Sequence, residues 1–135
     1  MTDGERATVV YVEDDAGNFR LVCRVLESTG KFRVLRATDG VAGFELVAKE
    51  KPQIALLDID IPLLNGLEVA RKIRQDPNLS QTPLLAVSAN VMRGEREACL
   101  DAGFDAFVEK PFDILKFRAL VIKLIEAREK ASDTD

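Results

Sequence analysis

Short apolar runs alternate along this chain with longer amphipathic segments. The apolar runs cover residues 8–12, 33–37, 54–57, 84–87 and 105–108, and each has the length of one strand. The third and fourth runs are apolar throughout, as expected for strands that are covered on both faces. Strands that alternate with helices in this way predict an α/β fold with a five-stranded parallel sheet and helices on both faces.

The segments between the runs carry apolar residues at helical spacing. In the first segment, these residues recur at the i, i+3, i+4 and i+7 positions of one helix face. The fourth segment, 93–102, offers little apolar surface, so we expect its helix to open more easily than the others. The residues that define the other four helices are Phe19, Val22, Cys23 and Leu26, then Phe44, Val47 and Ala48, then Val69, Ala70 and Ile73, and finally Ile114, Phe117, Val121, Leu124 and Ile125.

Polar residues and a glycine mark the ends of these helices. Asp15 and Asp39 stand where a side chain can cap the first and second helices, and Asn65 precedes the third. Gly103 suits the left-handed position that follows a helix, here the fourth. The capping signals therefore agree with the boundaries that the hydrophobic pattern predicts.

Composition limits the classes of function. The chain has 135 residues, of which 47% are hydrophobic and 31% charged, and this is typical of one globular domain. We expect that domain at residues 8–128, between a flexible N-terminus at 1–7 and a polar C-terminal tail at 129–135. The net charge of −4 argues against nucleic acid as a ligand, because phosphate-backbone binding needs clustered Lys and Arg.

The chain also lacks the signals of export and of membrane insertion. No apolar run approaches the ~20 residues of a membrane span, and the polar start has no signal-peptide pattern. Cys23 and Cys99 match no metal spacing, so we expect free thiols in a cytoplasmic protein. The absence of His excludes a histidine kinase, a phosphohistidine carrier and a Ser-His-Asp hydrolase.

Charged and polar side chains follow four of the predicted strands. Glu13 and Asp14 come after the first strand, Asp58 after the third, Ser88 after the fourth and Lys110 after the fifth. The carboxyl ends of parallel strands share one rim of the sheet, and ligands bind there. Mg²⁺ prefers oxygen ligands and takes one or two carboxylates together with water and phosphate oxygens. We therefore expect a magnesium site at this rim.

The three acids at the rim would repel one another without a cation. At ~4 Å, the repulsion is roughly 1 kcal/mol per pair in water and about 4 kcal/mol at an intermediate dielectric. The simpler alternative is that each acid is solvated or caps a helix, and this alternative suits Asp15 best. For Glu13, Asp14 and Asp58 taken together, a cation site explains the pattern better.

Asp58 is the expected nucleophile. A carboxylate can accept a phosphoryl group to form an acyl phosphate, and the transfer needs mainly positioning and charge neutralisation. Lys110 suits the role of a point charge that reaches the phosphoryl oxygens, and Ser88 can donate a hydrogen bond to them. Taken singly, Lys110 would be a surface lysine and Ser88 a strand-end hydroxyl. Their occurrence together at these strand ends favours phosphoryl chemistry.

The chain resembles the receiver domains of two-component response regulators from about residue 8 to residue 128. The resemblance implies a (βα)5 flavodoxin-like fold and phosphorylation of Asp58 by a phosphohistidine donor. The matching pieces are Val-Glu-Asp-Asp at 12–15, Leu-Leu-Asp-Ile-Asp-Ile-Pro at 56–62, Val-Ser-Ala-Asn at 87–90, Ala-Gly-Phe-Asp at 102–105 and Glu-Lys-Pro-Phe at 109–112.

The resemblance also implies the ligands of a metal ion. Glu13 and Asp14 would be the metal acids, and Asp58 would contribute a carboxylate oxygen. The backbone carbonyl of Asp60 would be the remaining protein ligand of Mg²⁺ or Mn²⁺. The side chain of Asp60 is less usual for the family, because it adds a fourth negative charge close to the phosphoryl site.

The resemblance also implies a conformational switch that responds to phosphorylation. By the resemblance, Ser88 is the switch hydroxyl, Phe107 the switch aromatic and Lys110 the lysine that binds the phosphoryl group. The family uses a cis peptide bond between Lys110 and Pro111 to direct that lysine into the site. Ser and Phe are variants at positions where Thr and Tyr are frequent in the family.

The implied partners are proteins. A histidine kinase or a histidine phosphotransfer protein would supply the phosphoryl group, and the chain would catalyse only its own phosphorylation and dephosphorylation. It is similar to free-standing receivers of the chemotaxis and cell-cycle kind, and we expect a monomer or weak dimer without membrane or nucleic-acid partners.

A downstream target would bind the face of the fourth helix, fifth strand and fifth helix. A second apolar stripe on the last helix fits either that face or a wide core contact, and comprises Leu115, Ala119 and Ile122.

Three alternatives stay open on the residues. A haloacid-dehalogenase-like phosphatase would use the Asp-x-Asp motif formed by Asp58 and Asp60, but that family carries the motif on its first strand. A flavodoxin-type cofactor carrier shares the fold class, but the acids at 13–15 would repel the phosphate of its cofactor. The third alternative is a receiver-shaped binding module that never accepts phosphate.

Overall fold

The computed structural model of the chain describes residues 6–89, 94–110 and 113–133. In these residues, strands and helices alternate as the hydrophobic pattern predicts. The strands are β1 (Ala7–Val12), β2 (Phe32–Ala37), β3 (Ile54–Asp58), β4 (Leu84–Ser88) and β5 (Ala106–Glu109). The helices are α1 (Ala16–Glu27), α2 (Gly40–Glu50), α3 (Gly66–Gln75), α4 (Glu95–Ala102) and α5 (Ile114–Asp133).

The five strands form one parallel sheet in the order β2-β1-β3-β4-β5, which confirms the predicted (βα)5 fold. The strand order reverses between β1 and β3, and a reversal of this kind opens a crevice at the carboxyl ends of the two strands. Val12 of β1 pairs with Leu57 of β3. The next residues, Glu13 and Asp58, therefore stand at the same level of two neighbouring strands.

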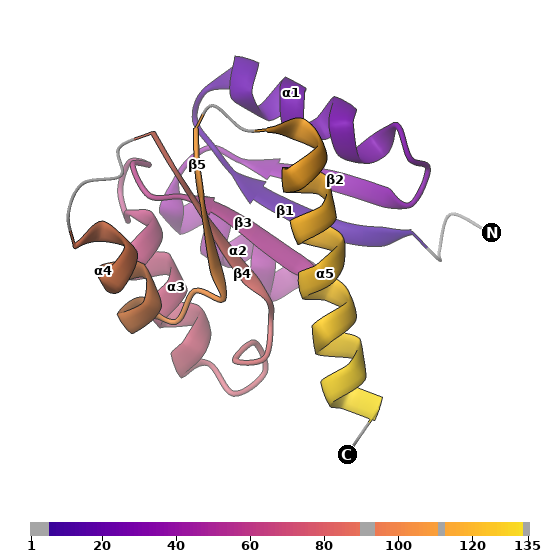
Figure 1. Cartoon of the computed structure of the whole chain (residues 1–135). Helices are drawn as coiled ribbons and strands as arrows, with labels where there is room; N and C mark the ends of the chain where they lie inside the picture. The colour runs from indigo at the N-terminus through magenta and orange to yellow at the C-terminus, as the bar shows by residue number, and fades with distance from the viewer. Residues whose placement is uncertain (1–5, 90–93, 111–112, 134–135) are drawn as a thin grey trace.

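The sheet separates two hydrophobic cores. Helices α1 and α5 cover one face, and α2, α3 and α4 cover the other (Figure 1). Along β1, the side chains alternate between the cores, with Val9 and Tyr11 on the α1–α5 side and Val10 and Val12 on the other. Every residue of β3 and β4 is buried, which confirms that these strands are covered on both faces.

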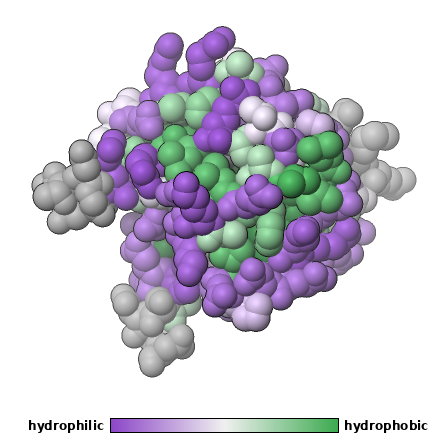
Figure 2. Space-filling view, turned by 180° about the vertical axis from the view of Figure 1, so that it is seen from behind, coloured by the Kyte–Doolittle hydropathy of each residue, from purple (hydrophilic) through white to green (hydrophobic). Residues whose placement is uncertain are grey.

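Large apolar side chains also reach the surface. Figure 2 shows the molecule from behind, with apolar patches between polar side chains. Over the whole described chain, the exposed large apolar residues are Leu21, Val41, Leu63, Leu100, Ile114 and Leu115. Within the described residues, no helix is both long enough and apolar enough to span a bilayer.

The predicted helix caps are confirmed. Asp15 accepts a hydrogen bond from the N–H of Asn18, and Asp39 accepts one from the N–H of Ala42. Asn65 forms a capping box with Glu68 at the start of α3, and Gly103 adopts the left-handed conformation with φ 105° after α4. These caps fix where α1, α2 and α3 begin, and so they fix the loops that join the helices to the carboxyl ends of β1, β2 and β3.

Two helices differ from their predicted extent. α5 continues beyond Arg128 to Asp133, into the segment expected to form a polar tail. α4 starts at Glu95, after Gly94, without a hydrogen-bonding cap from a side chain. The domain limits at 8 and 128 stay a prediction.

The site is sensitive to the volume at Gly66, where α3 meets the end of β3. The N–H of Gly66 donates to the carbonyl of Ile59, and a Cβ on Gly66 would lie 2.6 Å from the carbonyl oxygen of Asp58. We expect Gly66→Ala to lower the free energy of unfolding by roughly 1–3 kcal/mol, the usual cost of overpacking. Chemical denaturation measures this difference.

The matched control is Gly17→Ala in the exposed first turn of α1. There the new methyl group meets only the side chain of Asp15, at 3.2 Å. Because Ala is a better helix former than Gly, the control should change stability by about 1 kcal/mol or less. Equal destabilisation by both substitutions would contradict the packing argument.

Candidate functional site

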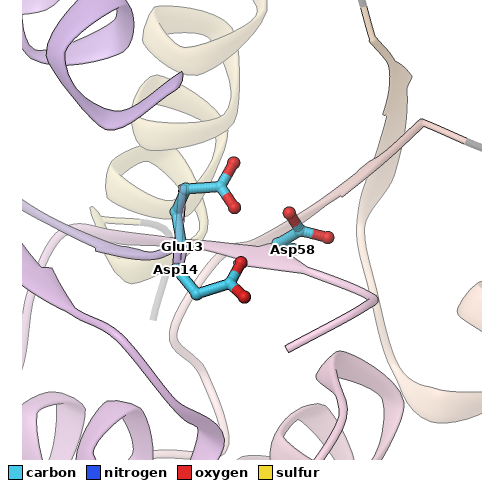
Figure 3. Close-up of side chains that lie close together, drawn as sticks. All are labelled: Glu13, Asp14 and Asp58. Carbon is cyan, nitrogen blue, oxygen red and sulfur yellow. The ribbon is translucent and has the colours of Figure 1, made fainter. Parts of the chain in front are cut away.

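Three carboxylates gather at the carboxyl ends of β1 and β3. Glu13 and Asp14 follow β1, and Asp58 is the last residue of β3. One oxygen from each lies within 4.8 Å of the others, and Figure 3 shows the three side chains side by side. Glu13 and Asp58 are buried, whereas Asp14 is exposed. The sequence prediction that these acids converge is therefore correct in its geometry.

Lys110 brings a positive charge between the two buried acids. Its Nζ lies 2.6 Å from Oε1 of Glu13 and 2.7 Å from Oδ2 of Asp58. The backbone N–H of Lys110 donates to the carbonyl of Ser88, which anchors the lysine where β5 ends beside β4. The contact with Asp58 fits the predicted role of Lys110. The contact with Glu13 was not foreseen, and it offsets part of the repulsion between the acids.

The surroundings shift the pKa values of the two buried acids in opposite directions. Burial, followed by the neighbouring Asp58, raises the pKa of Glu13. Burial alone would also raise the pKa of Asp58, but the neighbouring Glu13 and the hydrogen bonds from Lys110 and from the N–H of Asp60 hold that pKa below its usual value. Asp58 is thus kept ionised, as a nucleophile must be.

Lys110 stays charged in the same environment. Burial by itself would lower its pKa, but the hydrogen bonds to Asp58 and Glu13 outweigh burial and raise it. The amine is therefore a fixed positive charge beside the Asp58 carboxylate, with a side chain that is only 14% exposed.

Two further residues hold the segment that carries Glu13 and Asp14. The Tyr11 hydroxyl donates to Oε1 of Glu13 at 2.9 Å. Nε of Arg36 donates to the carbonyl of Glu13, and Nη2 donates to the carbonyl of Asp14, both at 3.1 Å. Sequence reasoning missed both residues. The signal for Tyr11 was available, because residues two apart on a strand point to the same face.

The remaining predicted residues lie around this centre. Asp15 caps α1 and takes no part in the acidic group that Glu13, Asp14 and Asp58 form. Asp60 is exposed, and its N–H donates to Oδ1 of Asp58 at 2.9 Å. Ser88 is fully buried at the end of β4, next to β3.

Phe107 lies on β5, on the side of α4. It is partly buried against the core that α2, α3 and α4 cover, and the guanidinium of Arg96 stands 6.0 Å from its ring centroid. The predicted cis bond between Lys110 and Pro111 lies outside the described residues.

The donor set fits a hard divalent cation. The group consists of carboxylate oxygens, which Mg²⁺ prefers, and it holds no sulfur or imidazole ligand that would favour zinc or copper. Asp14 is open to solvent, so a bound ion could keep water ligands, as Mg²⁺ usually does.

Comparisons with known proteins agree on one family. The family model of the response regulator receiver domain matches residues 9–122. The polar-differentiation response regulator DivK of Brucella anthropi is 31% identical over 110 residues, which cover 82% of this chain and 89% of DivK.

Solved structures show the same fold. The receiver domain of a sensor histidine kinase from Pseudomonas aeruginosa PAO1, with a magnesium ion coordinated in its active-site cleft, is 29% identical with a TM-score of 0.83. It covers 90% of this chain, which covers 98% of that domain. A CheY-like receiver from Methanospirillum hungatei JF-1 has a TM-score of 0.86 at 22% identity and covers 93% of this chain, which covers 98% of it.

These matches remove the support for a haloacid-dehalogenase-like phosphatase and for a flavodoxin-type carrier, because one signalling family accounts for nearly the whole fold. The parallel sheet, the acids at its strand reversal and the match over residues 9–122 lead to one conclusion: the chain belongs to the response regulator receiver domain family.

Proposed function

We propose that Asp58 accepts a phosphoryl group from a phosphohistidine donor in a reaction that requires Mg²⁺ or Mn²⁺. An oxygen of Asp58 attacks phosphorus, the phosphorus–nitrogen bond of the donor breaks, and the imidazole nitrogen keeps the electron pair. The observation that carries the proposal is the Lys110 amine, 2.7 Å from the Asp58 carboxylate and beside the two metal acids. This charge is placed to neutralise the incoming phosphoryl oxygens.

Four groups would hold the metal ion. They are the carboxylates of Glu13, Asp14 and Asp58 and the backbone carbonyl of Asp60. The ion would neutralise negative charge that builds up on the phosphoryl oxygens during transfer. The magnesium ion in the related Pseudomonas receiver supports this choice of metal.

Two other side chains would bind the product. Lys110 would pair with one phosphoryl oxygen, and the hydroxyl of Ser88 would donate to another. Ser88 is buried at the end of β4, one residue beyond Val87, which pairs with Asp58. Apart from its own phosphorylation and dephosphorylation, the chain would catalyse no reaction.

The phosphorylated state would be read on the face formed by α4, β5 and α5. Phe107 and Arg96 meet there beside a cavity of about 240 Å³. Displacement of Ser88 toward the phosphoryl group would open space for the Phe107 ring and favour one of two packings. The cavity is lined by Arg96, Cys99, Leu100, Phe104, Ala106 and Phe107.

The partners would be a histidine kinase or a histidine phosphotransfer protein and one downstream protein. The chain would act as a monomer or weak dimer in the cytoplasm, where thiols such as those of its two free cysteines stay reduced. Among the residues of the second apolar stripe, Leu115 is 65% exposed and Ala119 is exposed, and both are available to a target. Ile122 instead packs partly against the core.

The first test is phosphorylation of Asp58. Acetyl phosphate or a phosphorylated kinase, with Mg²⁺, should add one hydroxylamine-sensitive phosphate, and Asp58→Asn should abolish it because the nucleophilic oxygen is lost. Intact-mass spectrometry measures the addition, and Asp101→Asn, on the exposed face of α4, is the control. Label that persists on the same peptide of the Asp58→Asn variant would refute the assignment, and an unlabelled wild-type chain would favour the pure binding module.

The second test is the effect of magnesium on stability. At a hundredfold excess over Kd, Mg²⁺ should raise the free energy of unfolding by about 2.7 kcal/mol, if the unfolded chain does not bind it. Asp14→Asn should raise the metal-free melting temperature, because it removes one like charge from the group, and it should reduce the shift that Mg²⁺ produces. A melting shift equal to that of the wild type would exclude Asp14 as a ligand.

The third test separates phosphorylation from its readout. Phe107→Ala should leave the labelling rate of Asp58 nearly unchanged and abolish the changes that beryllofluoride causes across residues 94–110 and 113–122. Chemical-shift mapping measures these changes, and Leu46→Ala, which truncates a residue of the same core on α2, is the control. Changes confined to the loops that carry Glu13, Asp14 and Asp58 in the wild type would contradict a switch through Phe107.

A further inference from the structure

Glu13 depends on hydrogen-bond donors from the protein. Its side chain is only 1% exposed, so water cannot replace these donors. Oε1 accepts from Lys110 Nζ at 2.6 Å and from the Tyr11 hydroxyl at 2.9 Å, and Oε2 accepts a longer contact, 3.4 Å, from the N–H of Asp15. A buried charge that loses a donor destabilises the folded state. When one donor is lost, the remaining donors must therefore stabilise the charge.

Lys110 is a shared donor, whereas Tyr11 is not. The amine of Lys110 also contacts Oδ2 of Asp58 at 2.7 Å. A phosphoryl group on Asp58 would carry more negative charge than one carboxylate, and it would compete with Glu13 for the same amine. The Tyr11 hydroxyl hydrogen-bonds to Glu13, from the strand that leads into it.

The Tyr11 ring is held in place. Its side chain is fully buried, and the ring stacks on Phe19 with the two centroids 6.1 Å apart. The guanidinium of Arg36 lies 5.3 Å from the Phe19 centroid, and it also binds the carbonyls of the two residues that follow β1. Close packing on all sides leaves the hydroxyl little freedom to turn away from Glu13.

We propose that Tyr11 is a positioning residue of the metal site: its hydroxyl keeps the Glu13 carboxylate in place while the Lys110 amine changes partner from Glu13 to the phosphoryl group. The inference rests on the proposed function, because it requires Glu13 to serve the metal and Lys110 to serve the phosphoryl oxygens. It concerns the hydroxyl alone, so it can be separated from the contribution of the ring to the core.

The chain contains its own spectroscopic reporter for this contact. Tyr11 is the single tyrosine, and the chain has no tryptophan, so tyrosine emission comes from Tyr11 alone. A hydrogen bond from a phenol to a carboxylate quenches phenol emission. Titration with Mg²⁺ should change the emission with a midpoint equal to the calorimetric Kd, because the metal draws on the carboxylate that the hydroxyl binds. Calorimetric binding without any change of emission would overturn the inference.

Tyr11→Phe removes the hydroxyl and keeps the ring. We expect it to raise the calorimetric Kd for Mg²⁺ by about tenfold, the order expected for one lost hydrogen bond to a charged group. Val121→Ala truncates a buried α5 residue of the same core and should leave this Kd unchanged. Equal Kd values for Tyr11→Phe and the wild type would overturn the inference.

A double-mutant cycle tests the exchange of donors without metal. Tyr11→Phe should lower the unfolding midpoint more in a Lys110→Ala background than in the wild type, because Glu13 then loses both side-chain donors. Additive effects would overturn the inference. An unchanged Kd in Tyr11→Phe with normal labelling of Asp58 removes only the role of Tyr11, whereas a wild type that binds no Mg²⁺ and takes no label removes the proposed function as well.

Discussion

The arrangement of the site depends on one ammonium group that two buried carboxylates share. Glu13 follows β1, Asp58 ends the neighbouring strand β3, and Lys110 follows β5, with β4 between β5 and β3. The bridge therefore ties together the carboxyl ends of three strands. Burying charges in this way seldom adds stability, since the loss of hydration offsets the attraction. An arrangement that adds little stability agrees with a site whose purpose is chemical.

The two acids that share this bridge differ in their pKa values. Burial outweighs the hydrogen bonds that Glu13 accepts from Lys110 and Tyr11, and so the pKa of Glu13 is raised. At Asp58, the neighbouring Glu13, the amine of Lys110 and the N–H of Asp60 outweigh burial, and so its pKa is lowered. Environments that shift the pKa values of two titratable groups in opposite directions are typical of sites in which the groups have different roles. The lowered pKa of Asp58 agrees with its proposed role as the nucleophile, and the buried Glu13 carboxylate accepts hydrogen bonds from Lys110 and Tyr11.

Alternation along the strands connects this centre to both cores. Tyr11 points into the core beneath α1 and α5, and its hydroxyl reaches Glu13. Phe107 packs on the opposite face, against the core beneath α2, α3 and α4. Under the proposed function, Tyr11 would thus hold Glu13 from one face of the sheet, and Phe107 would respond to phosphorylation on the opposite face. A change at the readout face need not disturb the packing that holds Glu13.

Much of this structure follows from local sequence patterns. Apolar runs predicted the five strands, the caps at Asp15, Asp39 and Asn65 predicted the helix starts, and the parallel sheet placed the acids on one rim. These features depend on periodicity and on contacts between near neighbours, which a linear pattern records. Only the tertiary structure decided that Lys110 pairs with Glu13, 97 residues away, and that the Tyr11 hydroxyl turns to the same oxygen. Which donor neutralises which acid depends on strand order, on register and on the reach of each side chain, and none of these is a local property of the chain.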